Sequence, residues 1–333
     1  MILYHLPTFT MERLQENTDW PQKILIASPR GFCAGVERAV KALREVQQAN
    51  RGETVYSFHE IIHNKHVVEG FERDGVQFVN SLNEVPQGAP LVFSAHGVSP
   101  EVRDLAAVKR LRAVDATCPL VEKPHREARR FAKDGYEILY VGHAGHDETV
   151  GLLGEVPQAI KLIQTPEDAR DVVVNDPTKV ALLTQTTLSV DDTRLIRDII
   201  KERFPNIVEP PSSDICYATQ NRQDGVKAIV RRGAEAVVVV GSQNSSNSRR
   251  LAEVALSSGA VRSFLVDGAD ELDSMWFIGT EVVGLTSGAS APENKFQEVV
   301  SWFQERGSTH IEEVVMADES KIHFAPPKEL SEN

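Results

Sequence analysis

The amino-acid sequence predicts an α/β protein made of three similar modules with mostly parallel sheets. Apolar runs such as "VVVVG" and "ILYVG" lack polar alternation, as expected for parallel strands that are covered on both faces. Such runs are followed by small polar residues and then by apolar residues at helical intervals of three and four. The chain also holds three cysteines at intervals of roughly 90 residues, in similar contexts. Strands that alternate with helices in this way indicate βαβ units.

Composition narrows the function classes before any motif is considered. The 333 residues are 41% hydrophobic and 25% charged, as in ordinary globular proteins, and the net charge is −12. This charge argues against general nucleic-acid binding, which needs a basic surface. No apolar run is long enough to span a bilayer. We therefore expect a cytoplasmic protein that binds neither nucleic acid nor membrane.

The first 22 residues stand apart from the modular pattern. They lack the basic and apolar regions of a secretory signal, and their acidic residues count against a transit peptide. We treat residues 1–22 as an N-terminal extension to which the sequence assigns no role.

The first module is expected over residues 23–117. It opens with "KILIASPRGFCAGVERAV", which predicts a strand, a glycine-containing turn and a helix with Cys33 at its start. Two later junctions between a strand and a helix carry "HEIIHN" with His63 and "FSAHGVS" with His96. Each junction is thus predicted to place polar side chains where a strand ends and a helix begins.

The second module, residues 118–213, and the third, residues 214–308, repeat this order. Their cysteine contexts are "DATCPLV" and "DICYATQ", in which Asp115 and Asp214 are plausible helix caps. Their later junctions are "GHAGHDE", "TQTTLS", "GSQNSSNS" and "GASAP". The polar residues at these junctions are His146, Glu148, Thr186, Ser245, Ser246, Asn247 and Ser290.

The tail, residues 309–333, suggests a β-hairpin.

Ligands of parallel sheets bind where the strands end, so the three modules are expected to meet around a shared centre with one cysteine from each. A helix N-terminus should lower the pKa of each thiol and favour the thiolate. The absence of a C-x-x-C pair excludes a local zinc ribbon. Two metal sites remain open: zinc held by three cysteines and a histidine, or an iron–sulfur cubane with one iron free to act as a Lewis acid.

The other junctions mostly offer neutral hydrogen-bond donors, a set that suits a phosphate or diphosphate group. Taken singly, each has a simpler interpretation as a capping loop or a structural histidine. Their recurrence at matching places favours a binding site. Glu148 is the most obvious carboxylate among them, and burial would raise its pKa and make it a proton donor. The simpler alternative is an acid in the first turn of a helix.

Together these motifs resemble the 4-hydroxy-3-methylbut-2-enyl diphosphate reductase family, from about residue 23 to "PPKEL". The resemblance implies a three-lobed α/β fold around a central [4Fe–4S] cluster, one per chain, with three cysteine ligands and one open iron. It implies that Glu148 donates a proton and that Thr186 helps to position Glu148 and the substrate. It further implies cluster ligation by Cys33, Cys118 and Cys216, and diphosphate binding by His63, His96, His146, Ser245, Asn247 and Ser290, with Ser246 close by.

The implied reaction is a reductive dehydroxylation that yields isopentenyl and dimethylallyl diphosphate, with electrons from reduced ferredoxin or flavodoxin. One departure is Asp147, which stands where the resemblance leads us to expect proline. If both acids are buried, its charge should raise the pKa of Glu148 by repulsion. The alternatives are a zinc-dependent hydrolase of a phosphorylated small molecule and a non-enzymatic iron–sulfur redox sensor.

Overall fold

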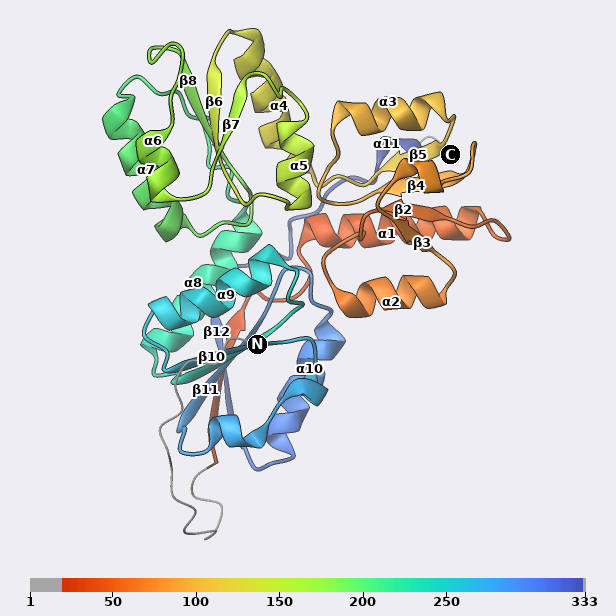
Figure 1. The fold of residues 1–333 in the computed structure, drawn as a ribbon. Coiled ribbons are helices and arrows are strands. Elements are labelled where there is room, and N and C mark those ends of the chain that lie inside the picture. The colour runs from red at the N-terminus through yellow and green to blue at the C-terminus, as the bar shows by residue number, and fades with distance from the viewer. Residues whose placement is uncertain (1–19, 332–333) are drawn as a thin grey trace.

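The computed structural model describes residues 20–331, and their strands form three separate sheets. Every pairing between the named strands is parallel, which confirms the predicted α/β class. Figure 1 shows three lobes, one around each sheet, that meet near the centre of the molecule.

The first lobe contains a four-stranded sheet in the order β3-β2-β4-β5. Its elements are α1 (Ala34–Ala49), β2 (Tyr56–Phe58), α2 (Lys65–Arg73), β3 (Gln77–Val79), the 3₁₀ helix η1 (Leu82–Glu84), β4 (Pro90–Phe93), α3 (Pro100–Val108) and β5 (Arg112–Asp115).

The second lobe contains a three-stranded sheet in the order β7-β6-β8. Its elements are α4 (Pro119–Lys133), β6 (Glu137–Val141), α5 (Asp147–Leu153), β7 (Ile160–Ile163), α6 (Pro166–Asp171), β8 (Val180–Thr184) and α7 (Val190–Arg203).

The third lobe contains a five-stranded sheet in the order β10-β9-β11-β1-β12. Its elements are β1 (Lys23–Ser28), α8 (Tyr217–Arg231), β9 (Ala236–Val240), α9 (Ser246–Ser257), β10 (Arg262–Val266), the 3₁₀ helices η2 (Ala269–Glu271) and η3 (Ser274–Phe277), β11 (Val282–Ser287), α10 (Glu293–Gln304) and β12 (His310–Val315).

The sheets do not follow the contiguous module boundaries at the two ends of the chain. Strand β1 lies between β11 and β12 in the third lobe, paired from Lys23 with His310 to Ser28 with Val315. Its central residues are buried, which suits an interior position in a five-stranded sheet. Strand β1 thus lies in the predicted first module but completes the third sheet. The module boundaries remain a prediction, at residues 23–117, 118–213, 214–308 and 309–333.

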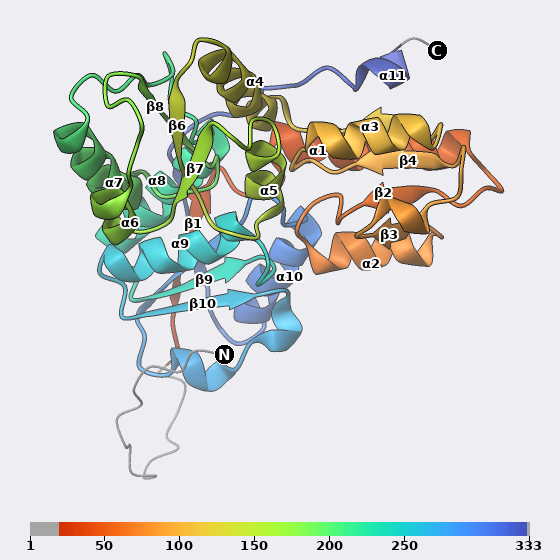
Figure 2. The same cartoon turned by 45° about the horizontal axis from the view of Figure 1, so that its top comes forward.

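The C-terminal tail is a single parallel strand and not the hairpin that we expected. Between β12 and residue 331 the structure has no further strand, and Pro326 and Pro327 offer no backbone N–H for a ladder. The tail instead leaves the third lobe and ends at the short helix α11 (Lys328–Ser331), which lies beyond the first lobe in Figure 2. There Leu330 packs against the first-lobe core.

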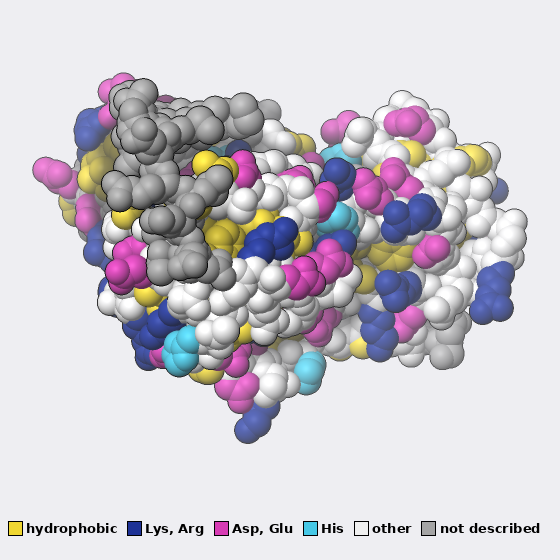
Figure 3. Space-filling model, turned by 90° about the horizontal axis from the view of Figure 1, so that it is seen from below, with side chains coloured by type: hydrophobic (Ala, Val, Ile, Leu, Met, Phe, Trp, Pro, Cys, Tyr) yellow, Lys and Arg dark blue, Asp and Glu magenta, His cyan; other side chains and the backbone are white. Residues whose placement is uncertain are grey.

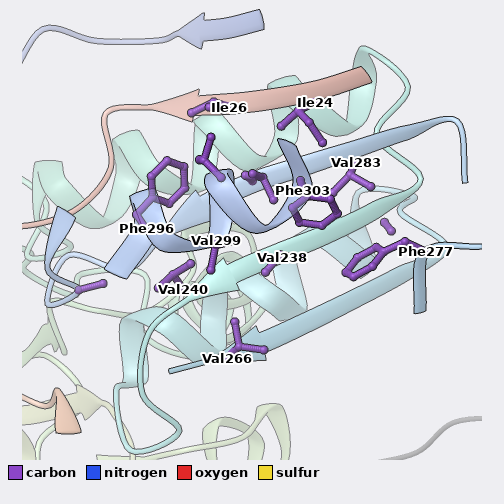
Figure 4. Packing of buried hydrophobic residues seen from close by; sticks show 14 residues of the cluster. Ile24, Ile26, Val238, Val240, Val266, Phe277, Val283, Phe296, Val299 and Phe303 are labelled. Carbon is purple, nitrogen blue, oxygen red and sulfur yellow. The ribbon is translucent and has the colours of Figure 1, made fainter. Parts of the chain in front are cut away.

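Figure 4 shows the apolar core on one face of the third sheet, where Ile24, Val238 and Val283 meet Phe296 and Phe303 of α10. Trp20 packs against this core, and its indole N–H donates to Ser308 at 3.0 Å. The last residues of the proposed N-terminal extension therefore belong to the third lobe. The rest of that extension, residues 1–19, lies outside the described residues.

The described surface carries charged side chains of both signs. On the face shown in Figure 3, acidic and basic side chains are interspersed and do not form one broad basic stripe. Among residues 20–331, no helix is both long enough and apolar enough to cross a bilayer.

Candidate active site

Each of the three cysteines caps the start of a helix. Cys33 precedes α1, Cys118 precedes α4 and Cys216 precedes α8. The prediction that Asp115 and Asp214 cap the second and third helices was therefore wrong. Asp115 instead accepts the Thr117 backbone N–H at 3.0 Å and Asp214 that of Thr184 at 3.0 Å, so both aspartates stabilise the backbone before the helices begin.

The structure brings the cysteines of different lobes close together. An ideal Cβ built on Gly35 would lie 2.5 Å from Sγ of Cys118 and 3.9 Å from Sγ of Cys33. Because glycine has no Cβ, Gly35 leaves the space beside these two sulfurs unfilled. Cys216 is near enough to both for the charges of the three thiolates to influence one another. The sulfurs of the three lobes therefore lie near one another.

The predicted lowering of the thiol pKa values was wrong. Burial raises the pKa of Cys118 to about 12 and that of Cys216 to about 11, and it also raises the pKa of Cys33. Backbone N–H groups at the helix starts act in the opposite direction but do not outweigh burial. Thiolates at these positions consequently need a cationic partner such as bound iron.

The spacing of the sulfurs distinguishes the two predicted metal sites. Three thiolates on one tetrahedral zinc ion would lie within about 4 Å of one another. Across residues 20–331, the cysteine sulfurs do not form a group of three ligand atoms within 4.8 Å of one another. The three sulfurs are therefore spaced more widely than one tetrahedral zinc ion requires.

Glu148 lies in the first turn of α5, and its carboxyl group is almost fully buried. One oxygen accepts the backbone N–H of Thr186 at 2.8 Å, and the other accepts the Thr186 hydroxyl at 3.0 Å. The Thr186 carbonyl in turn accepts the N–H of Cys216 at 3.0 Å. Thr186 therefore connects the acid directly to the cysteine that begins α8.

Burial raises the pKa of Glu148 to about 7, although both hydrogen bonds from Thr186 oppose this rise. The charge of Asp214 is a smaller contribution in the same direction as burial. Asp147 is not among the causes of this rise. Its side chain is only partly buried and contacts His59, so the condition for the expected repulsion, burial of both acids, is not met. Near neutral pH, Glu148 can therefore hold a proton and release it.

Three of the predicted histidines gather beside α5 in a group that we call the histidine cluster. The rings of His63 and His96 stack with centroids 3.9 Å apart and planes inclined by 16°. His146 meets both rings edge-on and accepts the N–H of Glu148 on Nδ1 at 3.2 Å. Burial lowers the pKa of His146 to about 4 and holds the pKa of His96 well below its usual range.

A second polar group, which we call the serine–asparagine cluster, surrounds the start of α9. Ser245 caps this helix and lies 3.3 Å from the hydroxyl of Ser290, which donates to the His63 carbonyl at 3.0 Å. Ser246 accepts a hydrogen bond from Thr187 at 3.0 Å. Asn247 is buried, and neither its amide nitrogen nor its amide oxygen has a protein partner. Such an unsatisfied amide is costly unless a ligand completes it.

Two further pairs support the cysteines and were not identified from the sequence. Lys123 of α4 contacts Asp214 at 3.0 Å, and Arg222 of α8 contacts Glu319 of the tail at 3.1 Å. Arg222 also donates to the Gly31 carbonyl at 2.8 Å, two residues before Cys33. Lys123 and Arg222 each lie five or six residues after a cysteine, and this spacing is the only sequence pattern that points to them. Their partners, Asp214 and Glu319, come from distant parts of the chain.

Residues 24–304 match the family model described as "LytB protein". A 4-hydroxy-3-methylbut-2-enyl diphosphate reductase of Acidothermus cellulolyticus is 52% identical over 92% of this chain and 90% of its own length. The enzyme of the same name from Streptomyces coelicolor is 51% identical over 93% of this chain and 90% of its own.

The solved structure of a Plasmodium falciparum protein, named E-1-hydroxy-2-methyl-but-2-enyl-4-diphosphate reductase, superposes with a TM-score of 0.90 at 34% identity. The superposition covers 94% of this chain and 98% of the other. A second reductase structure, described as the terminal enzyme of the non-mevalonate pathway, gives a TM-score of 0.60 at 30% identity over 85% of this chain and 99% of its own.

Proposed function

The chain belongs to the LytB protein family, and we propose that it is a 4-hydroxy-3-methylbut-2-enyl diphosphate reductase. The substrate's allylic hydroxyl group is replaced by hydrogen, with consumption of two electrons and two protons and release of one water. The products are isopentenyl and dimethylallyl diphosphate, which differ in the end of the allyl unit that receives the second proton.

The observation that carries this proposal is the connection of Glu148 to Cys216 through Thr186. Glu148 is a buried acid with a pKa of about 7. Only Thr186 stands between it and Cys216, and Thr186 hydrogen-bonds to both. A purely structural metal site, or a redox sensor, has no use for a proton donor at this place. A reductive loss of water needs one, because hydroxide is a poor leaving group without a proton.

We infer that Cys33, Cys118 and Cys216 hold one [4Fe–4S] cluster per chain and leave one iron open. When bound, the cluster supplies electrons singly and offers its open iron as a Lewis acid for the substrate's oxygen. The chain contributes the three thiolates, the space left by Gly35 and the N–H groups of three helix starts. These N–H groups help to stabilise the negative charge of the cluster.

The diphosphate is assigned to the region between the histidine cluster and the serine–asparagine cluster. The hydroxyl of Ser290 joins the two clusters, since it contacts Ser245 and the His63 carbonyl. Asn247 supplies an amide without a protein partner, and α9 supplies the N-terminal backbone N–H groups that bind phosphate well. His63, His96, His146 and Ser246 complete the proposed set of donors.

The protein's part in the chemistry is to hold the substrate and to deliver a proton. Glu148 gives up its proton as the carbon–oxygen bond breaks, so that water and not hydroxide leaves. Thr186 stabilises the resulting carboxylate through two hydrogen bonds, which are already present before the reaction. The electrons are assigned to an external one-electron donor, a reduced ferredoxin or flavodoxin.

Anaerobic purification tests this function against both alternatives. The proposal predicts brown protein with about four irons per chain that bleaches in air, and loss of iron when any one cysteine is replaced by alanine. Colourless protein with one zinc would support the hydrolase. A protein with a full cluster that leaves the allylic diphosphate unchanged in the presence of a strong one-electron reductant would support the sensor.

A further inference from the structure

Asp147 lies among histidines of two different lobes, and the proposed reaction does not yet use it. From the start of α5 in the second lobe, one oxygen lies 2.9 Å from Nδ1 of His59. The other lies 3.8 Å from Nε2 of His63 and 3.8 Å from Nδ1 of His96, both in the first lobe. One carboxylate thus faces three imidazoles that extend from strand ends of the neighbouring lobe.

A shared metal ion does not account for this group, although His63, His96 and Asp147 present ligand atoms within 4.8 Å of one another. A metal ion binds an imidazole nitrogen along the direction of its lone pair, in the ring plane. The rings of His63 and His96 are stacked nearly parallel, 3.9 Å apart, so a single ion cannot lie in both planes. Stacked rings can, however, present two N–H groups side by side to one anion.

The partner of Asp147 in the first lobe is held in an uncommon conformation. His59 has a φ of 61°, in the left-handed region that residues other than glycine seldom adopt. Its ring stacks on Phe58 with centroids 4.2 Å apart, which leaves Nδ1 directed at Asp147. This conformation costs free energy, and the hydrogen bond to Asp147 helps to offset the cost.

We propose that Asp147 is a specificity-determining residue whose carboxylate takes the position of an anion beside His59, His63 and His96 in the free protein. This inference rests on the proposed function, which assigns the substrate's diphosphate to the same histidines. A diphosphate that reaches His63 and His96 then competes with Asp147 for their N–H groups. The carboxylate therefore sets the affinity of the site for anionic ligands.

This competition is electrostatic as well as geometric. The titratable groups that face Asp147 are His59, His63, His96 and His146, and Glu60 lies 3.2 Å from Nδ1 of His63. Burial lowers the pKa of His146 to about 4 and also lowers that of His96, which disfavours the positive charge that would offset two anions. A carboxylate and a diphosphate beside the same rings therefore repel each other, and this repulsion weakens diphosphate binding.

Titration of the anaerobic holoenzyme with inorganic diphosphate, followed by calorimetry at pH 8, tests the proposal. Asp147→Asn keeps an acceptor for His59 but removes the charge. Asp176→Asn removes one charge from a distant exposed turn and controls for net charge. Asn247→Ala reports whether diphosphate binds at the proposed site at all.

The proposal predicts that Asp147→Asn binds diphosphate about fivefold more tightly than the wild type at pH 8. Asp176→Asn should match the wild type, and Asn247→Ala should weaken binding. If Asn247→Ala weakens binding while Asp147→Asn matches the wild type or binds more weakly, the role of Asp147 is refuted and the diphosphate site stands. If Asn247→Ala has no effect, the diphosphate assignment fails and the role of Asp147 fails with it.

Discussion

At the scale of single residues, the behaviour of the site depends on how burial and hydrogen bonding compete at Glu148. Burial raises the pKa of its carboxyl group, whereas both hydrogen bonds from Thr186 stabilise the ionised form and lower it. Burial prevails, and the pKa of about 7 lies near neutral pH. A general acid is most effective near that balance, because it holds its proton yet releases it readily.

This balance predicts a pH dependence of turnover. Only protonated Glu148 can donate, so kcat should fall as pH rises through about 7 and should be nearly constant below it. Replacing Glu148 with glutamine should reduce turnover about 100-fold or more, while iron content stays that of the wild type. Steady-state kinetics between pH 5.5 and 9 with a viologen reductant measures both effects, and a flat profile would contradict the assignment of Glu148 as the acid.

Gly35 is a second residue whose smallness matters. In an exposed helix position, glycine to alanine stabilises a protein by roughly 1 kcal/mol. In Gly35→Ala, however, the new methyl group would lie 2.5 Å from Sγ of Cys118, so we expect loss of bound iron from a folded protein. Gly70→Ala in α2 is the matched control, because its methyl group would meet nothing nearer than 4.0 Å. Iron analysis decides, and equal iron in both variants would refute the role of Gly35.

At the scale of elements, α4 and the segment before α8 are fixed to each other. Lys123 lies five residues after Cys118 and donates to the carbonyls of Ser212 and Ser213 at 2.6 and 2.9 Å. It also contacts Asp214, whose second oxygen accepts the N–H of Thr184 at the end of β8. The helix that begins at Cys118 thereby holds the loop that leads to Cys216.

Breaking this connection should loosen the proposed cluster without unfolding the chain. Lys123→Met removes three contacts of one ammonium group and leaves Asp214 buried without its cation. We expect the visible absorption of the holoenzyme to bleach in air about tenfold faster than that of the wild type. Lys133→Met, an exposed change at the end of the same helix, is the control. Equal bleaching rates for the two variants would show that Lys123 does not position the cysteines.

At the scale of the whole molecule, the C-terminal tail connects lobes that the sequence order keeps apart. It leaves β12 in the third lobe and reaches the first lobe, where the Arg38 guanidinium donates to the Ala325 carbonyl at 2.7 Å. On the way, Glu319 pairs with the fully buried Arg222, which also contacts Gly31. The tail thus runs beside the loop that carries Cys33 and helps to hold it.

Removing the carboxylate of Glu319 should destabilise the whole protein. A buried arginine that loses its partner retains the cost of desolvation, so Glu319→Ala should lower the free energy of unfolding by about 3 kcal/mol. Glu313→Ala, whose ion pair with Arg30 is half-exposed, should cost less than about 1 kcal/mol. Denaturant titration of both variants measures the difference, and equal losses would contradict the role given to Glu319.

The sequence was sufficient to predict features that depend on neighbouring residues and that recur along the chain. The strand–polar–helix order predicted the positions of Cys33, Cys118 and Glu148, because each lies shortly after the end of a strand. Cys216 follows α7 and a loop, and it was predicted from the similarity of its context to the other two. Sequence could not identify partners that come from another lobe. The pairs Lys123–Asp214 and Arg222–Glu319, and the placement of β1, depend on contacts between distant segments. Our prediction of the thiol pKa values was wrong for a related reason. Burial, which depends on distant segments, raises these pKa values more than the N–H groups of the local helix N-terminus lower them.

Product analysis tests the central claim most directly. The anaerobic holoenzyme would be incubated with 4-hydroxy-3-methylbut-2-enyl diphosphate and reduced methyl viologen, and the products would be identified by NMR. The claim predicts isopentenyl and dimethylallyl diphosphate, with two viologen radicals oxidised for each molecule of product. Release of phosphate or diphosphate without oxidation of viologen, or recovery of unchanged substrate, would contradict it.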